Sequence, residues 1–421
     1  METRPSRREL LAVGGLALLS SASLRALVTA GEAETRMPRF QIPLPIPDVL
    51  NPVKADATTD YYEIVHREAA LEILPGRLTT IWGYNGRFPG PTIKARCGRT
   101  TVIRHTNELH TPTVVHLHGG VTPPESDGFP TDHIMPGSSR TYTYPNEGRG
   151  ATLWYHDHAM DHTGRNIYMG LAGMYVLEDP SERALRLPSG AFDIPLVIQD
   201  RLFDEDGAFV YDTFFQLAAK GGVMLVNGAP WPRLEVAARK YRFRMLNASN
   251  ASPLRLALSS GRPMVHVATD GGLLQAPVTL REIPLAMAER AEVVIDFAEY
   301  PVGTRVVLQN LNRSDLSGRP SDEIVRFDVV RPEEDDSALP VRLNSVQAIC
   351  TDMAVRTRHF VLSGGPRLGL PPVTHWTING RDFEADRPIA TPRYGDVEIW
   401  HFENRRLLGF LGLVIPSTSI S

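Results

Sequence analysis

Short segments in which apolar and polar residues alternate recur along the chain. The run VAARKYRFR at 236–244 is an example, and such alternation is typical of strands that are buried on one face. Asn-Gly pairs at 85–86, 227–228 and 379–380 stand between β-prone runs, and this pair is a strong signal for a tight turn. The pattern therefore predicts an all-β chain in which strands and tight turns follow one another.

The same order of features occurs three times. Residues 82–108, 224–249 and 376–404 each run from an Asn-Gly pair through a proline-containing turn and a strand to a closing asparagine. The repeats are roughly 150 residues apart, which is the size of one β-sandwich with insertions. We therefore expect three related β-domains at 35–180, 181–335 and 336–421, of which the last is short enough to be incomplete.

Composition narrows the class of protein. The chain has 421 residues, which suggests two or three domains, and its 42% hydrophobic and 22% charged residues are typical of a soluble globular protein. A formal net charge of -4 does not indicate a nucleic-acid partner or an anionic membrane surface. The two cysteines, Cys97 and Cys350, are too few for a disulfide framework, and either one bridge or two buried thiols fits them.

The N-terminal segment has the pattern of an export signal. Arg7 and Arg8 precede a modest apolar run from Leu10 to Leu24, which is too short and too rich in Gly and Ser to span a bilayer. Paired arginines in this position favour a twin-arginine signal peptide over residues 1–34, with an ordinary secretory signal or an uncleaved anchor as the alternatives. We expect a periplasmic or secreted protein with no stable membrane insertion after cleavage.

Four of the thirteen histidines form two H-x-H pairs. His116 and His118 lie in VVHLHGG, and His156 and His158 lie in LWYHDHAMDH, each pair after apolar, β-prone residues. Residues i and i+2 of a strand share a face, so two such pairs on neighbouring strands form a pocket of four imidazoles. Imidazole without thiolate suits copper, zinc or iron. Two pairs this close together favour a metal site over polar filling of a surface or core, and the glycines that follow His118 allow close approach of the backbone.

These motifs resemble a known family. HLHGGVTPPESDG, followed by TLWYHDHAMDHTGRNIYMGLAGMYVLED, is similar to the first domain of three-domain multicopper oxidases. Within that family the chain looks closest to the bacterial laccases, bilirubin oxidases and phenoxazinone synthases, through RFPGPTI, IPLVIQDRLFDEDG, AERAEVVIDF and WTINGRDF. The resemblance implies tandem cupredoxin-like Greek-key β-sandwiches, two of them complete and a third truncated, and an enzyme that oxidises phenolic or similar aromatic donors and reduces O2 to water.

The resemblance also implies roles for individual residues. His116 would bind the type 2 copper of a trinuclear cluster, and His118, His156 and His158 would bind the paired type 3 coppers. Asp127, in PPESDG, matches an acidic position that helps to deliver protons to bound dioxygen. A loop-capping aspartate before Gly128 is an equally good interpretation of Asp127. Trp154 and Tyr155 are expected to pack in the core.

The third repeat lacks the motifs that would complete such a site. By resemblance, an H-x-x-H-x-H segment and an H-C-H segment supply the type 1 copper ligands and the other four cluster histidines. Neither occurs in this sequence, and neither cysteine is flanked by histidines. After His162 the remaining histidines are isolated in the sequence: His266, His359, His375 and His401.

Three explanations fit the segment RRLLGFLGLVIPSTSIS: a shifted or early-terminated reading frame, a natural truncation, or a second polypeptide that supplies the missing ligands. The first is favoured, because the segment lacks the polar alternation of the preceding strand. A sandwich without its last strands is expected to expose an apolar edge. The hypothesis is that this chain binds copper weakly or partially and does not turn over.

Two other functions compete with this interpretation. HDHAMDH approximates the H-x-H-x-D-H signature of metallo-β-lactamase-like zinc hydrolases, but it has one residue too many before Asp161 and His162, and that fold requires alternating strands and helices. A non-catalytic copper-binding or structural cupredoxin-like protein is the second alternative. Metal analysis distinguishes the hydrolase, because two zinc ions per chain would favour it.

Overall fold

The computed structural model describes residues 38–211, 222–314, 320–346, 348–367 and 373–405. The predicted signal peptide at 1–34 and the apolar segment at 406–421 lie outside the described residues. Strands dominate the described chain, so the all-β prediction is confirmed. None of the described helices is long and apolar enough to cross a bilayer.

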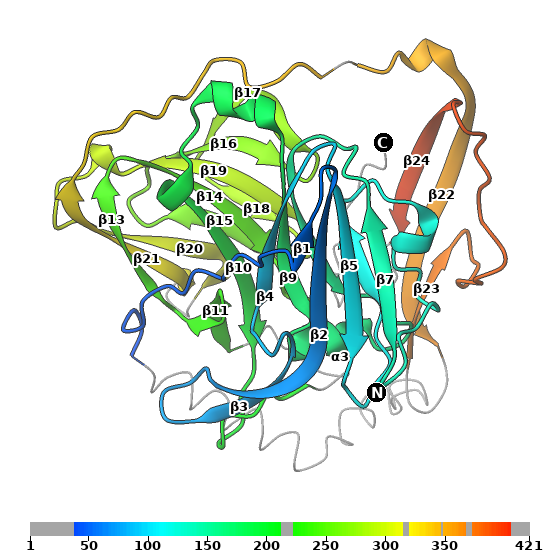
Figure 1. Cartoon of the computed structure of the whole chain (residues 1–421). Coiled ribbons are helices and arrows are strands. Elements are labelled where there is room, and N and C mark those ends of the chain that lie inside the picture. The colour runs from blue at the N-terminus through cyan, green and yellow to red at the C-terminus, as the bar shows by residue number, and fades with distance from the viewer. Residues whose placement is uncertain (1–37, 212–221, 315–319, 347, 368–372, 406–421) are drawn as a thin grey trace, which may run out of the picture.

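The first module contains two sheets that pack around one core (Figure 1). One sheet consists of β1 (Lys54–Ala55), β2 (Thr59–Glu72), β3 (Leu78–Tyr84), β5 (Thr100–Asn107) and β7 (Ser139–Tyr144). The other consists, in spatial order, of β4 (Gly90–Arg96), β9 (Ala172–Glu178), β8 (Ala151–Asp157) and β6 (Val115–His118). The short helices are η1 (Pro124–Ser126) and α3 (Thr163–Met169). Both H-x-H motifs are thus on the second sheet or directly after it.

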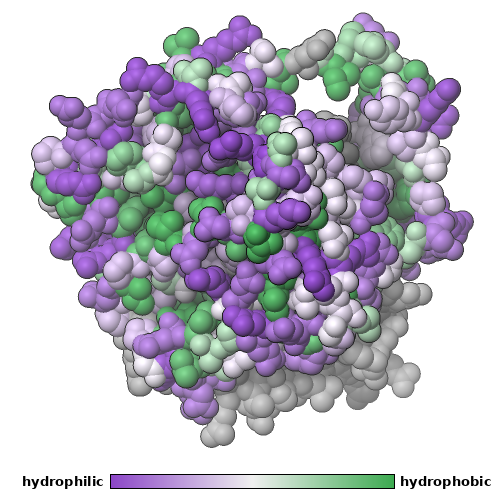
Figure 2. All heavy atoms as spheres, viewed as in Figure 1, coloured by the Kyte–Doolittle hydropathy of each residue, from purple (hydrophilic) through white to green (hydrophobic). Residues whose placement is uncertain are grey.

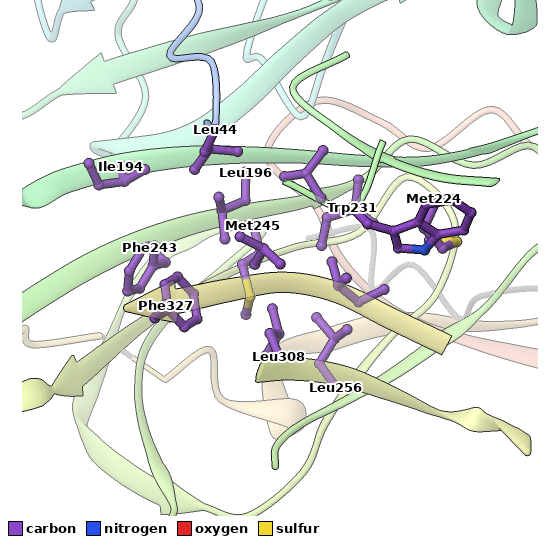
Figure 3. Packing of buried hydrophobic residues seen from close by; sticks show 14 of the residues in the cluster. Leu44, Ile194, Leu196, Met224, Trp231, Phe243, Met245, Leu256, Leu308 and Phe327 are labelled. Carbon is purple, nitrogen blue, oxygen red and sulfur yellow. The ribbon is translucent and has the colours of Figure 1, made fainter. Parts of the chain in front are cut away.

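The middle module is a larger sandwich. Its first sheet has the order β12 (Ala229–Pro230), β11 (Val223–Val226), β10 (Asp193–Arg201), β14 (Lys240–Asn247), β19 (Arg290–Asp296), β16 (Met264–Thr269) and β17 (Gly272–Leu280). Its second has the order β13 (Arg233–Ala238), β21 (Pro320–Pro332), β20 (Arg305–Ser314), β15 (Leu254–Leu258) and β18 (Ile283–Leu285). The short 3-10 helices η2 (Pro180–Leu185) and η3 (Gly190–Phe192) lie between β9 and β10, and η4 (Phe297–Glu299) lies between β19 and β20. Apolar side chains from both sheets meet in its core, where Leu196, Phe243 and Met245 face Leu308 and Phe327 (Figure 3).

The third module, within the described residues, is a single sheet of β23 (Val373–Ile378), β22 (Ala354–Arg367) and β24 (Val397–Arg405), preceded by η5 (Thr351–Met353). The segment that leads to it from β21 runs along one edge of the molecule (Figure 1). Among the described side chains of this sheet, Phe360 is the only buried hydrophobic residue, and Trp376 and Phe402 are 46% and 41% exposed. Its aromatic face is therefore largely uncovered by described residues.

Figure 2 shows a mostly hydrophilic surface on the viewed face, with apolar side chains in scattered small groups. The two cysteines are free thiols, Cys97 half-buried and Cys350 exposed, so they form neither a bridge nor two buried thiols.

His359 and His401, which look isolated in the sequence, are adjacent in the sheet of the third module, because parallel pairing of β22 and β24 places them in register. The expectation that they are isolated is wrong.

The threefold repeat has a structural counterpart. In each module a strand pairs in parallel with the strand that contains the closing asparagine: β2 with β5, β10 with β14 and β22 with β24. The first residue of each Asn-Gly pair has a positive φ, between 52° and 56°, as a tight turn of this type requires. Each of these asparagines also accepts a 2.8 Å hydrogen bond through Oδ1 from the backbone N–H of Val65, Val197 or Val361. The turn prediction is confirmed in all three places.

A pair of histidines is enclosed in the core of the first module. His66 Nε2 lies 2.9 Å from His105 Nδ1, and His66 Nδ1 lies 3.0 Å from the hydroxyl of Thr113. Both rings are fully buried. Burial lowers the pKa of His66 to about 3, and burial together with the neighbouring His66 lowers the pKa of His105 well below its usual value. Both imidazoles are therefore neutral at ordinary pH.

Candidate metal centre

The two H-x-H motifs meet because β6 and β8 are adjacent antiparallel strands. His116 is directly opposite His156, and His118 is directly opposite Trp154. Since side chains alternate along a strand, His116 and His118 share one face with His156, and His158 continues that face just beyond the end of β8. The backbone N–H of His158 donates to the carbonyl of Val114, which extends the pairing by one more step. The predicted face of four imidazoles is present.

The four rings form one compact cluster. The ring centroid of His116 lies 5.5 Å from that of His118, 5.4 Å from that of His156 and 5.2 Å from that of His158. Ligand nitrogens of His116, His118 and His156 lie within 4.8 Å of one another. His118 Nδ1 and His156 Nε2 are 3.2 Å apart. Two nitrogens that bind the same tetrahedral ion at about 2.0 Å are separated by roughly 3.3 Å, so this pair has the spacing of a shared ion.

Hydrogen bonds to backbone carbonyls orient two of the rings. Nδ1 of His116 lies 2.5 Å from the carbonyl oxygen of Asp127, and Nδ1 of His156 lies 2.8 Å from the carbonyl oxygen of Asp157. A carbonyl can only accept, so each Nδ1 carries the proton and each Nε2 presents a lone pair to the cluster. Nδ1 of His158 is buried without a hydrogen-bond partner in the described chain, as expected of a nitrogen in a site built for another group.

The surroundings of His118, His156 and His158 favour the neutral imidazole, which is the form that binds metals. Burial, together with the charge of Arg290, lowers the pKa of His118 to about 3. Burial also lowers the pKa of His156 and of His158. A pocket of imidazole nitrogens without thiolate fits copper. The donor set thus agrees with the metal implied by the resemblance.

Comparisons with known proteins agree with this geometry. The sequence profile of the multicopper oxidase family matches residues 67–182, which include both H-x-H motifs. The chain is 36% identical to a laccase of Bacillus subtilis (strain 168) over 87% of this chain and 80% of the relative. It is 37% identical to a bilirubin oxidase of Albifimbria verrucaria over 87% of this chain and 67% of the relative.

Solved structures show the same likeness. A laccase of Pediococcus acidilactici aligns with a TM-score of 0.78 at 29% identity, covering 87% of this chain and 77% of the other. The McoA multicopper oxidase of Aquifex aeolicus aligns with a TM-score of 0.75 at 32% identity, covering 86% of this chain and 81% of the other.

This chain belongs to the multicopper oxidases. By family it is therefore a copper-binding oxidoreductase that uses O2, and the resemblance inferred from the histidine motifs is confirmed. The zinc-hydrolase alternative is wrong, because the fold is all-β and lacks the alternating strands and helices that this alternative requires. His162, its further ligand, instead precedes α3, and its ring lies 3.5 Å from the hydroxyl of Thr111.

Asp127 contacts His116 through both its backbone and its side chain. Its carbonyl orients His116, a contact that the sequence motif does not reveal. Its carboxylate is half exposed, accepts a 3.0 Å hydrogen bond from Thr122, and lies 3.5 Å from His116 Nδ1. The proximity of His116 lowers the pKa of this carboxyl. Gly128 follows with φ of +81°, and a Cβ there would overlap the carbonyl oxygen of Val115.

The residues between and beside the histidines behave as core residues. Trp154 is buried, with its ring centroid 4.0 Å from that of His156 and 5.3 Å from that of His118. It belongs to an apolar cluster shared by strands of the first and middle modules. Tyr155 points to the opposite face and donates a 2.7 Å hydrogen bond to the carbonyl of Pro91. The prediction that both pack in the core is confirmed.

Arg290 of the middle module also supports the site, although sequence reasoning did not single it out. Its guanidinium is buried, pairs with Asp270 at 2.8 Å and donates from Nε to the carbonyl of Thr152 on β8 at 2.9 Å. A Cβ on Gly119, directly after His118, would lie 2.5 Å from this guanidinium. The side chain thus contacts both histidine-bearing segments. The sequence around it, AERAEVVIDF, does not reveal this role, because Arg290 contacts β8 across the boundary between two modules.

The hydroxyl of Thr152 forms a second link between the modules. It donates to Glu292 at 2.6 Å and accepts from Arg244 at 2.9 Å. Burial raises the pKa of Glu292, but the ion pairs with Arg242 and Arg244 outweigh it and lower the pKa to about 2. Strand β8 is therefore held from the middle module through both its backbone and a side chain.

Proposed function

We propose that the four histidines are one half of the ligand set of a trinuclear copper cluster. His116 is assigned to the type 2 copper, and His118, His156 and His158 to the type 3 pair. The observation that carries this assignment is the 3.2 Å separation of His118 Nδ1 and His156 Nε2, with His116 facing the same space. The carbonyls that orient His116 and His156 support it, because they fix Nε2 as the ligand atom.

Copper bound at this cluster supplies the one-electron chemistry by which O2 is reduced to two molecules of water. Burial holds His118, His156 and His158 neutral, and the ring of Trp154 lies against the rings of His118 and His156. Asp127 delivers protons: its carboxylate is half exposed and 3.5 Å from His116, so it exchanges protons with solvent at Oδ1 beside the cluster. Reduction of O2 to water consumes four protons, which gives this carboxylate a chemical role.

The electron donor is proposed to be a phenol or a similar aromatic compound. This proposal is supported by similarity to proteins described as laccases and as a bilirubin oxidase, at 36–37% identity.

The polypeptide of these 421 residues is proposed to bind copper only partially and not to turn over. It contains no H-C-H segment, and Cys97 and Cys350 are not flanked by histidines. The described part of the third module is one sheet with an exposed aromatic face. A second polypeptide that supplies the missing ligands would restore turnover, whereas a non-catalytic copper-binding protein would not need them.

Export by the twin-arginine route to the periplasm or the exterior is part of the same proposal. It is supported by Arg7 and Arg8 before the apolar run in residues 1–34. Replacement of both arginines by lysine is expected to keep the protein in the cytoplasm when cell fractions are compared. Unchanged export would contradict this route.

Copper content and turnover test the assignment together. The chain, loaded anaerobically with copper, is expected to bind metal that is lost in the double variant His116→Gln/His118→Gln, to show no blue absorbance near 600 nm, and to consume no O2 with a phenolic dye. Full copper retention in the double variant would contradict the cluster. Rapid O2 consumption by the unmodified chain would contradict the impairment and leave the cluster assignment standing.

A further inference from the structure

His359 and His401 form a pair on the solvent side of the third module. They are directly opposite each other in the parallel register of β22 and β24, and both side chains are exposed. Their rings are nearly parallel, with an interplanar angle of 14° and centroids 4.9 Å apart. Within the part of the chain that the structure describes, neither imidazole has a hydrogen-bond or ion-pair partner.

The framework under this pair is well held. On the opposite face of the same two strands, Arg358 forms two hydrogen bonds with Glu398, at 2.6 Å and 2.8 Å. Beside them, the rings of Phe360 and Phe402 stack with their centroids 5.2 Å apart. A bidentate ion pair and an aromatic stack across the same two strands fix their register. The backbone positions of the two histidines are therefore set before any ligand binds.

The spacing of the rings suits chelation. A metal ion about 2.0 Å from an imidazole nitrogen lies about 3.2 Å from the ring centroid, so two centroids 4.9 Å apart subtend an angle of about 100° at a shared ion. This angle is between the tetrahedral value and the right angle of adjacent positions in a square plane. The rings need only turn about their Cβ–Cγ bonds to direct one nitrogen each at the same point, and exposed rings have room to do so.

We propose that His359 and His401 form a second metal site, which binds a divalent late transition-metal ion and holds Cu²⁺ most tightly. Two imidazoles with the remaining positions open to water favour copper over nickel and zinc, following the general order of affinities. The site is open to solvent and has only two protein ligands, so its ion exchanges readily. It is independent of the cluster formed by His116, His118, His156 and His158, and it holds whether or not the chain turns over.

The test is a titration of metal-free full-length chain with Cu²⁺, followed by dialysis equilibrium and by electron paramagnetic resonance. The unmodified chain is expected to bind one more Cu²⁺ than either His359→Gln or His401→Gln. The double variant His359→Gln/His401→Gln is expected to bind as many Cu²⁺ ions as each single variant. The extra ion should show an axial signal with coupling to two imidazole nitrogens. The matched control His133→Gln removes one exposed histidine from the first module and should change nothing.

Two further measurements keep the outcomes distinct. The variant His116→Gln/His118→Gln should retain the two-imidazole signal, which separates failure of this site from failure of the cluster. Retention on immobilised Cu²⁺ should weaken equally in His359→Gln and His401→Gln, with thermal midpoints unchanged. Equal copper binding by the unmodified chain and both single variants would overturn the proposal. An undiminished two-imidazole signal in the double variant His359→Gln/His401→Gln would overturn it as well.

Discussion

The buried pair His66–His105 makes the first module sensitive to acid. In an unfolded chain His66 titrates near its usual pKa of 6.5, whereas burial lowers its pKa in the folded chain to about 3. Between these values the unfolded state binds more protons, so stability falls as the pH falls from 6.5 toward 3 and is fully present above 6.5. Lowering the pH from 7.5 to 5.0 is expected to remove about 2 kcal/mol through His66 alone.

The perturbation that tests this is His66→Gln, since glutamine can still hydrogen-bond to Thr113 but does not ionise in this range. The substitution itself shifts stability at every pH, so the quantity to compare is the loss between pH 7.5 and pH 5.0. That loss is expected to be smaller in the variant by about 2 kcal/mol, or about 6 °C in the thermal midpoint of the first module.

The assay is thermal unfolding of metal-free protein followed by tryptophan fluorescence at both pH values. His133→Gln, at an exposed position of the same module, serves as the control and should keep the full acid sensitivity of the unmodified chain. Acid titration of the cluster histidines is common to all three proteins and cancels in the comparison. An equal drop in midpoint for His66→Gln and the unmodified chain would refute the reasoning.

Substitutions at three further positions test the supports of the histidine cluster. Gly128→Ala, at a positive φ and against the carbonyl of Val115, is expected to destabilise the first module by about 2 kcal/mol and to weaken copper binding, as measured by thermal unfolding and equilibrium dialysis. Thr152→Val leaves Glu292 without a hydroxyl donor and should cost about 1–3 kcal/mol in denaturant unfolding. Arg290→Gln removes the positive charge beside His118 and should alter the electron paramagnetic resonance signal of bound copper, an effect that Arg290→Lys should largely avoid.

The contacts of Arg290 and Thr152 explain why the histidine strands depend on a second module. Strand β8 carries His156 of the cluster. Its Trp154 also packs in an apolar group with residues of β10 and β14 from the middle module. The ion-paired side chains of the middle module then hold both the backbone and the hydroxyl of Thr152. A change in the middle module can thus move metal ligands that it does not contact directly.

Much of this protein follows from local sequence. The all-β class, the Asn-Gly turns and the shared face within each H-x-H pair depend on alternation and on short-range turn geometry, which act within a few residues. Two H-x-H motifs on neighbouring strands predict a pocket of four imidazoles, and the pairing of β6 with β8 brings them together.

Other features were decided by the tertiary structure, because they join residues that are far apart in the chain. Arg290 reaches β8 across a module boundary, the carbonyl of Asp127 orients His116 through the path of a loop, and His66 meets His105 through a parallel strand pair. His359 and His401 are 42 positions apart and looked isolated until the register of β22 and β24 placed them together. Strand register is a property of the whole sheet, and no short stretch of sequence contains it.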